Sequence, residues 1–143
     1  MIPTLHFTTE SLQSYLHDIY PHTANLISVE ELSPHHATIR LFIQKEELRP
    51  GGTISGPTLF TAADCAFYCA LLGMIGPKPL AVTSNVSISF YRKPKPVDVI
   101  GKARILKLGR VLAMGDCLIY SDKEETPVAQ ASVTYAIPSD QSA

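Results

Sequence analysis

The stretch of residues 56–72 reads GPTLFTAADCAFYCALL. Its one charged side chain is Asp64, and no other residue between positions 50 and 77 is charged at neutral pH. Pro57 stands in the first turn, where a helix loses nothing by the missing N–H, and the stretch contains no further proline. Because apolar residues occupy nearly all sides of the resulting helix, we expect residues 57–75 to form a buried helix at the centre of the domain.

Asp64 interrupts this apolar surface, and a carboxylate on a core helix loses most of its hydration. Such a group is paired with a hydrogen-bond donor, protonated, or kept because chemistry requires it. A satisfied structural carboxylate is therefore one interpretation. The glycine-rich turn that leads directly into the helix, Ser55-Gly56, favours a functional one.

Alternating apolar and polar residues predict strands on both sides of the helix. Upstream, residues 26–32 and 37–44 read as a hairpin. Downstream, four strand-like runs follow at residues 80–92, 97–108, 111–121 and 128–137. Short turns connect these runs, and we expect consecutive strands to pair antiparallel because a parallel crossover needs about a dozen residues or more. The chain therefore predicts an α+β domain, with the long helix packed on one face of a curved antiparallel sheet.

The first downstream run shows the alternation most clearly. We expect its apolar side chains to share one face, namely Val82, Val86, Ile88 and Phe90. The polar side chains then share the other face, namely Thr83, Asn85, Ser87 and Ser89.

The rest of the chain predicts a short helix and a loop. Apolar residues recur at positions 12, 15, 16 and 19 behind capping hydroxyls, which predicts a short amphipathic N-terminal helix. Residues 46–55 contain Pro50-Gly51-Gly52 and read as a loop. At 143 residues the chain is expected to form a single domain, residues 1–143.

Composition excludes several classes of function. The balance of 12 basic and 13 acidic residues, a formal net charge of −1, lacks the electrostatic footprint of a protein that binds nucleic acid or an anionic membrane. Three cysteines, two of them one helical turn apart, do not form a secreted disulfide framework. No signal-peptide pattern opens the chain, and the apolar helix is too short and mixed to span a bilayer. We therefore expect a soluble, cytoplasmic protein.

Metal and nucleotide sites are not predicted. His17 and His22 lie five residues apart and His35 and His36 are adjacent, so neither pair matches a metal site without further ligands. The glycine pair of the loop lacks the lysine of a phosphate-binding loop. The two cysteines of the long helix are expected to pack as small apolar residues.

Five motifs between residues 26 and 137 share one resemblance. They read SGPTLFTAAD (residues 55–64), AVTSNVSISF (81–90), RKP (92–94), KLGR (107–110) and AQASV (129–133). Their order and content resemble the hot-dog-fold acyl-CoA thioesterases of the phenylacetic-acid-pathway, or PaaI-like, type. The resemblance implies an α+β hot-dog fold, in which a curved antiparallel sheet of five to six strands wraps a long central helix, here with a short N-terminal helix added.

In that family a His-Gly-Gly turn opens the central helix, and an aspartate lies eight residues after the first glycine. Gly56 and Asp64 have this spacing, whereas Ser55 replaces the histidine and Pro57 replaces the second glycine. The backbone donor that the resemblance assigns to Gly56 is retained. Ser55 or Thr53 is then the candidate to take over the role of the histidine.

The resemblance implies hydrolysis of an acyl-CoA or aryl-acyl-CoA thioester to free acid and CoA, without metal or cofactor. Gly56 N–H suits the role of hydrogen-bond donor to the oxyanion. At the N-terminus of the helix, unsatisfied amide groups and the positive end of the helix dipole both point toward an incoming oxyanion. Asp64 is the expected general base on water or, alternatively, the nucleophile that forms a mixed anhydride. Thr83 falls where some members have a hydroxyl that positions the water, although an ordinary strand threonine fits the pattern equally well.

The resemblance also implies partners. Its members place their sites at a subunit interface, so we expect a homodimer or tetramer, which agrees with a one-helix, one-sheet layer whose other face is bare. CoA carries a pyrophosphate and a 3′-phosphate. The candidate phosphate ligands are the turn cations Arg92, Lys93, Arg110 and Arg49, each of which also fits a solvated loop charge.

Two other functions are weighed against hydrolysis. A hot-dog dehydratase or hydratase is disfavoured because those enzymes carry a catalytic histidine, and no histidine follows His36. A non-catalytic acyl-CoA sensor or carrier, in which Asp64 is only structural, is the alternative.

Overall fold

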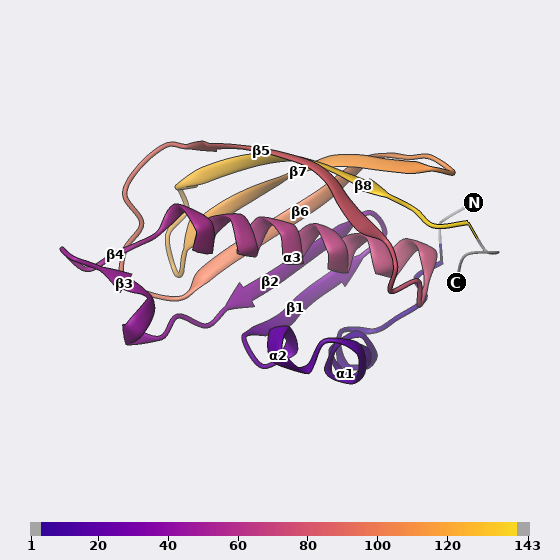
Figure 1. The fold of residues 1–143 in the computed structure, drawn as a ribbon, viewed down its shortest axis with the longest axis horizontal. Helices are drawn as coiled ribbons and strands as arrows, with labels where there is room; N and C mark the ends of the chain where they lie inside the picture. The colour runs from indigo at the N-terminus through magenta and orange to yellow at the C-terminus, as the bar shows by residue number, and fades with distance from the viewer. Residues whose placement is uncertain (1–3, 140–143) are drawn as a thin grey trace.

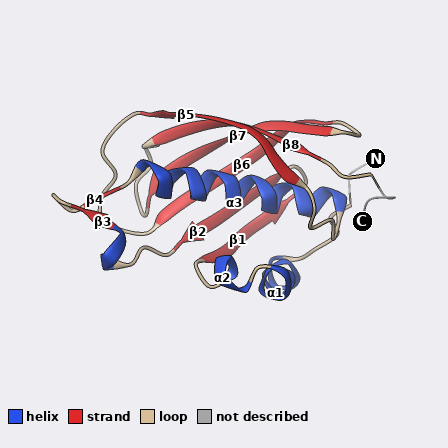
Figure 2. Cartoon of the chain, viewed as in Figure 1, coloured by secondary structure: helices blue, strands red, loops and turns tan. Residues whose placement is uncertain are grey.

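The computed structural model describes residues 4–139, in which one long helix packs on a six-stranded antiparallel sheet (Figure 1). In spatial order the sheet contains β1 (Ile27–Ser33), β2 (His36–Leu41), β6 (Val99–Leu108), β7 (Leu112–Ser121), β8 (Ala129–Ala136) and β5 (Val82–Phe90). The sheet curves around the long helix, α3 (Gly56–Ile75), so the predicted α+β hot-dog architecture is confirmed (Figure 2).

Local sequence sets both ends of α3. Ser55 is its N-cap, and the Ser55 hydroxyl accepts a hydrogen bond from the Thr58 backbone N–H at 3.4 Å. Gly76 ends the helix with a φ of 86°, a backbone angle that favours glycine. The expectation that this helix is too short and mixed to span a bilayer is wrong by length and composition, because the 20 residues of α3 are apolar enough to cross a membrane. Most of its apolar side chains are buried within this domain. It is the core helix of the fold.

The N-terminal residues form the predicted amphipathic helix, α1 (Thr9–Ile19), and a second short helix, α2 (Pro21–Ala24). Gln13 ties α1 to β1. Its side-chain N–H₂ donates to Ile27 O at 3.2 Å, and its side-chain oxygen accepts from Val29 N–H at 2.9 Å. Both helices therefore lie beside β1 and close one side of the domain (Figure 1).

The predicted loop at residues 46–55 contains more regular structure than expected. A 3₁₀ turn (Lys45–Glu47) leads into a two-stranded ribbon, β3 (Leu48–Arg49) and β4 (Thr53–Ile54). Two glycines turn the ribbon, with φ angles of 93° and 72°. The ribbon lies at the N-terminal end of α3 and brings Arg49 to that end of the molecule (Figure 1).

One pairing prediction is wrong, because β5 and β6 are consecutive strands but not neighbours. β5 lies at the opposite edge of the sheet, where it pairs with β8. The connecting residues 91–98 run past the beginning of β8, and Tyr91 N–H donates to Val128 O at 2.7 Å. Pro94 and Pro96 explain the difference, since prolines hold the segment extended and offer no N–H to a hairpin.

The predicted faces of β5 are wrong for Val82 and Thr83, because the strand contains a bulge. The register of β5 against β8 shifts between Thr83 and Asn85, so β5 contains one unpaired extra residue. Thr83 consequently lies opposite the buried Tyr135 and points toward α3, as Val86 does, whereas Val82 is 56% exposed. Strict alternation fails here because one extra residue reverses the facing of the strand beyond it.

Candidate functional site

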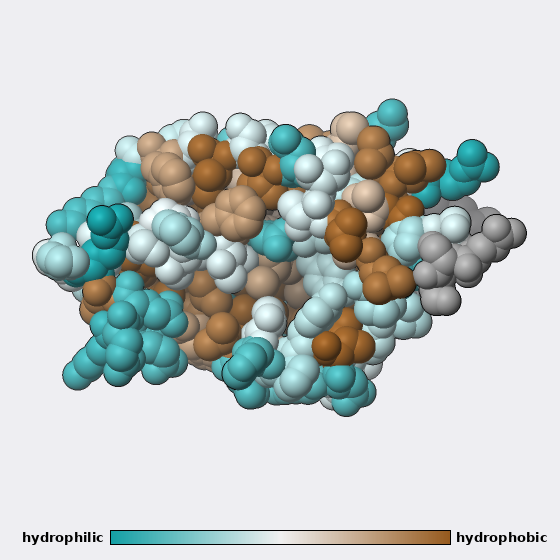
Figure 3. All heavy atoms as spheres, in the orientation of Figure 1, coloured by the Kyte–Doolittle hydropathy of each residue, from teal (hydrophilic) through white to brown (hydrophobic). Residues whose placement is uncertain are grey.

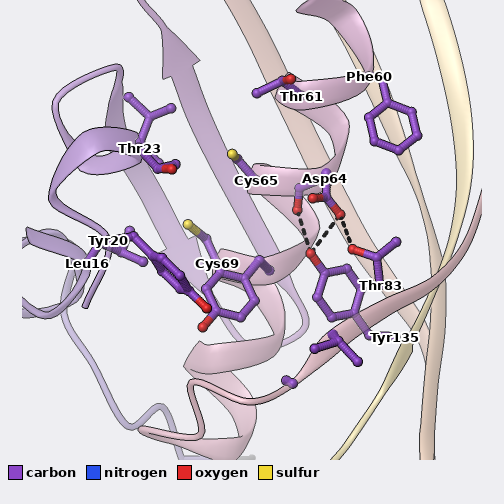
Figure 4. A pocket seen from close by; sticks show the side chains of 14 residues that line it. Leu16, Tyr20, Thr23, Phe60, Thr61, Asp64, Cys65, Cys69, Thr83 and Tyr135 are labelled. Carbon is purple, nitrogen blue, oxygen red and sulfur yellow. Dashed lines mark hydrogen bonds between the residues drawn. The ribbon is translucent and has the colours of Figure 1, made fainter. Parts of the chain in front are cut away.

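Two hydroxyl groups hold one carboxylate oxygen of Asp64, in the middle of α3 (Figure 4). Thr83 Oγ1, from β5, donates to Asp64 Oδ1 at 2.6 Å, and the Tyr135 hydroxyl, from β8, donates to the same oxygen at 2.7 Å. Tyr135 also donates to the Asp64 backbone oxygen at 3.3 Å. The Asp64 side chain is only half-buried. Within residues 4–139 both side-chain donors bind Oδ1, so the carboxylate is oriented and Oδ2 is left to accept a further donor.

Tyr135 is a site residue that the sequence patterns alone do not single out. Its side chain is 3% exposed, and its ring stacks on those of Phe67 and Tyr68 with centroids 5.5 and 5.9 Å away. Burial, and then the charge of Asp64, raise the pKa of the Tyr135 hydroxyl, so it remains a neutral donor. The available signal is its alternation with Val133 on one face of a strand, because a buried tyrosine needs a hydrogen-bond partner.

A cavity of about 440 Å³ opens beside this carboxylate (Figure 4). Its walls come from the N-terminal helices, from one face of α3, and from β1, β5 and β8. Apolar and aromatic side chains predominate, among them Leu16, Ile27, Cys69 and Ala81. Among the residues that the structure describes, Asp64 is the one charged residue of the lining, so the cavity suits a neutral, largely apolar group next to a single carboxylate.

Gly56 and Ser55 lie at the N-terminus of α3, away from Asp64 of the same chain. Gly56 is the first helical residue, so its N–H belongs to the turn that has no intrahelical acceptor. The Ser55 hydroxyl caps the helix and lies 3.0 Å from Thr58 Oγ1. At 1.5 Å per residue, Gly56 and Asp64 are separated by about 12 Å of helix. One chain alone therefore does not bring this donor and this carboxylate to the same atom.

The predicted CoA-binding cations form two separate groups. Arg49, Arg92 and Lys93 belong to two segments that meet near the beginning of α3. The Thr53 hydroxyl of the ribbon donates to Pro94 O at 3.5 Å, and Lys93 Nζ lies beside Gly51 of the ribbon turn. Arg110 lies in the β6–β7 turn, at the end of the sheet where β5 begins. The length of β5 separates the two groups by roughly 26 Å, at about 3.3 Å per residue.

The thiols beside the site lack the character of nucleophiles. Burial, and then the charge of Asp64, raise the pKa of Cys65 to about 12, and burial likewise raises the pKa of Cys69. Across residues 4–139 the structure contains no group of three histidine, cysteine or acidic side chains that would hold a metal ion. The chemistry of the site therefore centres on Asp64.

Comparison with known proteins places this chain in a family. A family model described as the thioesterase superfamily matches residues 51–128, more than half of the chain. A solved protein of Silicibacter sp. TM1040, provisionally described as a thioesterase, shares 44% sequence identity over 94% of each chain, with a TM-score of 0.88. No curated protein matches the chain.

Two PaaI proteins have the same fold. The phenylacetic acid degradation protein PaaI of Thermus thermophilus, solved as a mutant, is 25% identical over 82% of this chain and 99% of its own, with a TM-score of 0.70. The PaaI protein of the E. coli phenylacetic acid degradation operon is 20% identical over 93% of this chain and 97% of its own, with a TM-score of 0.75, and shares the fold. The chain belongs to the thioesterase superfamily and has the hot-dog fold of its PaaI-type members.

Proposed function

We propose that the protein is an acyl-CoA thioesterase, with Asp64 as its catalytic carboxylate. Membership of the thioesterase superfamily supports the reaction class, hydrolysis of a thioester. The observation that carries the proposal is the half-buried carboxylate of Asp64, which lines an apolar cavity and has Oδ1 held by two hydroxyls. A carboxylate oriented in this way is suited to take a proton from water or to attack a carbonyl carbon.

The proposed site needs a second copy of the chain, because Gly56 and Asp64 of one chain lie too far apart to act on one atom. β5 offers the docking edge: it pairs with β8 on one side and, within residues 4–139, has no partner strand on the other. Exposed apolar side chains lie along this edge, namely Val82, Phe90 and Tyr91. Hydrophobic surface also gathers over β5 in Figure 3. We therefore propose a homodimer in which two β5 strands pair antiparallel.

Antiparallel pairing brings opposite ends of the two β5 strands together. Within one chain Thr83, near the beginning of β5, bonds to Asp64, whereas Phe90, at its end, packs against Gly56, where a Cβ would lie 3.2 Å from the Phe90 ring. The pairing therefore brings Gly56 of the second copy toward Asp64 of the first. The pairing also brings Arg110 of the first copy toward the end of β5 in the second copy, where Arg49, Arg92 and Lys93 lie. This arrangement supports one shared site for the CoA phosphates.

In the proposed reaction, water bound to Asp64 attacks the thioester carbonyl carbon while the carboxylate accepts a proton from it. The carbonyl oxygen gains the negative charge and accepts a hydrogen bond from Gly56 N–H of the second copy, a donor that contributes about 3 kcal/mol. The C–S bond then breaks, and the CoA thiolate takes the proton from Asp64. In the second route Asp64 attacks the carbonyl carbon directly, and the C–S bond breaks as CoA thiolate leaves. Water then hydrolyses the mixed anhydride to the free acid, which regenerates the Asp64 carboxylate, and the thiolate takes the proton that the water releases. Neither route uses a metal or a cofactor.

Turnover of a panel of acyl-CoAs tests the proposal. Purified protein is assayed with short, medium, long and aryl acyl-CoAs and a thiol reagent that detects released CoA. We expect Asp64→Asn to lower kcat by about 10²–10⁴, the usual contribution of a general base. Asp18→Asn, at an exposed position of α1, is the matched control. Turnover unaffected by Asp64→Asn overturns the assignment of Asp64, and binding without turnover across the panel indicates the alternative, a non-catalytic acyl-CoA sensor or carrier.

A further inference from the structure

We infer that the cavity beside Asp64 is the acyl site of each subunit and that Tyr20 limits the acyl group it admits, to an apolar chain of medium length or a single aromatic ring. This acyl site rests on the proposed function, because it binds the acyl group of the same reaction.

The cavity extends from the carboxylate toward the N-terminal segment (Figure 4). Side chains between residues 61 and 69 of α3 line one wall, which at 1.5 Å per residue is about 12 Å long. Asp64 and Thr83 form one side, and Leu16 and Tyr20 lie across the cavity from them. An acyl group whose carbonyl carbon meets Asp64 therefore points its tail toward Tyr20.

The chemistry and the volume of the cavity restrict this tail. Asp64 is the one charged residue of the lining between residues 4 and 139, so a charged tail would lose its hydration without gaining a partner. The volume of about 440 Å³ is roughly three times the ~150 Å³ of a cavity that binds benzene. The tighter limit is the length of the cavity: its wall of about 12 Å fits a ring or an extended chain of medium length and is shorter than an extended long-chain fatty acyl group.

Tyr20 closes the cavity at the corner between α1 and α2. Its ring meets the Tyr68 ring edge-on at a centroid distance of 6.1 Å. The hydroxyl groups of both tyrosines donate to Pro79 O, at 3.4 Å from Tyr20 and 3.2 Å from Tyr68. These contacts join the N-terminal segment to the residues that precede β5. Tyr20 is 44% exposed, so its ring separates the cavity from solvent.

Chain-length profiles of wild type and wall variants test this inference. Saturated acyl-CoAs of increasing length and benzoyl-CoA are assayed with wild type, Tyr20→Ala and Tyr20→Phe. For wild type we expect kcat/KM to rise about fourfold per buried methylene up to a medium length and then to fall. Tyr20→Ala opens the wall and moves the maximum to longer chains, and Tyr20→Phe, which keeps the ring, moves it less. His17→Ala, an exposed α1 position outside this cavity, controls for a general effect on the helix.

A profile that Tyr20→Ala leaves unchanged overturns the inference while the proposed function stands. If wild type hydrolyses no acyl-CoA, the proposed function fails, and calorimetry with non-hydrolysable 2-oxoalkyl-CoA analogues then tests the acyl site by itself. In that case Tyr20→Ala is expected to bind the longer analogues more tightly than wild type does, and equal affinities at every chain length contradict the inference. Thermal melting of each variant separates loss of the wall from loss of the fold.

Discussion

Removal of the two hydroxyls that hold Asp64 tests how the carboxylate is prepared for chemistry. Thr83→Val and Tyr135→Phe each delete one hydroxyl and keep the shape of the side chain. Both hydroxyls bond to the same oxygen, Oδ1, at 2.6 and 2.7 Å. Loss of one therefore leaves the carboxylate held by the other, and loss of both frees it to rotate.

The expected loss of activity follows from the strength of these hydrogen bonds. A hydrogen bond to a charged group contributes about 1.5–3 kcal/mol, and we expect the lower value while the second hydroxyl remains. Each single substitution then lowers kcat about tenfold. The double substitution is expected to lower kcat by about 10³, or about 4 kcal/mol, because residues that share a contact couple by about 0.5–3 kcal/mol.

The assay measures kcat and KM with the best substrate of the acyl-CoA panel. The loss is expected in kcat rather than in KM, since the hydroxyls orient the carboxylate and not the acyl group. Tyr120→Phe, which deletes a phenol hydroxyl on β7 outside the site, is the control for loss of a hydroxyl alone. Single variants within about twofold of wild type, or a double variant whose loss equals the product of the single losses, would refute a shared hold on the carboxylate.

Two further predictions concern stability. Gly115→Ala drives a Cβ into the Arg104 carbonyl oxygen, so the backbone must shift. We expect a loss of about 3 kcal/mol and a fall in Tm of about 10 °C by thermal melting, and an unchanged Tm contradicts this packing. Arg40→Gln removes the cation shared by three carboxylates, one of which, Asp122, has its pKa lowered chiefly by the hydrogen bond from Arg40. That stabilisation is present above a pH of about 4 and is lost as the pH falls through the lowered pKa, so melting curves of wild type and variant should differ at about pH 7 and converge in acid. A difference that stays constant over this range counts against the ion pairs as its source.

Helix α3 and the strands were predictable because their signals are local. A capping serine, a proline in the first turn and a closing glycine bound α3, and its apolar sides lie within the same 20 residues. Asp64 is the one charged residue in this apolar stretch, which singles out the carboxylate of the candidate site, and the resemblance to PaaI-like thioesterases gives its spacing from Gly56 a meaning. Alternation within each strand likewise needs no knowledge of the neighbouring strand.

The position of β5 and the partners of Asp64 were not predictable in this way. A bulge in β5 points Thr83 toward α3. The segment with two prolines that follows β5 crosses to β6 instead of forming a hairpin. Tyr135 reaches Asp64 from 71 residues away. No local pattern distinguishes it from the other residues that alternate along β8.

Residues close together in the sequence are therefore sufficient to predict the helices, the strands and an isolated carboxylate in the core helix. The folded chain alone decides that β5, among residues 4–139, forms a free edge beside β8 and that two hydroxyls hold Asp64 Oδ1. These features depend on packing between segments tens of residues apart, and the free energy of that packing belongs to the assembled sheet and helix rather than to any short stretch of sequence.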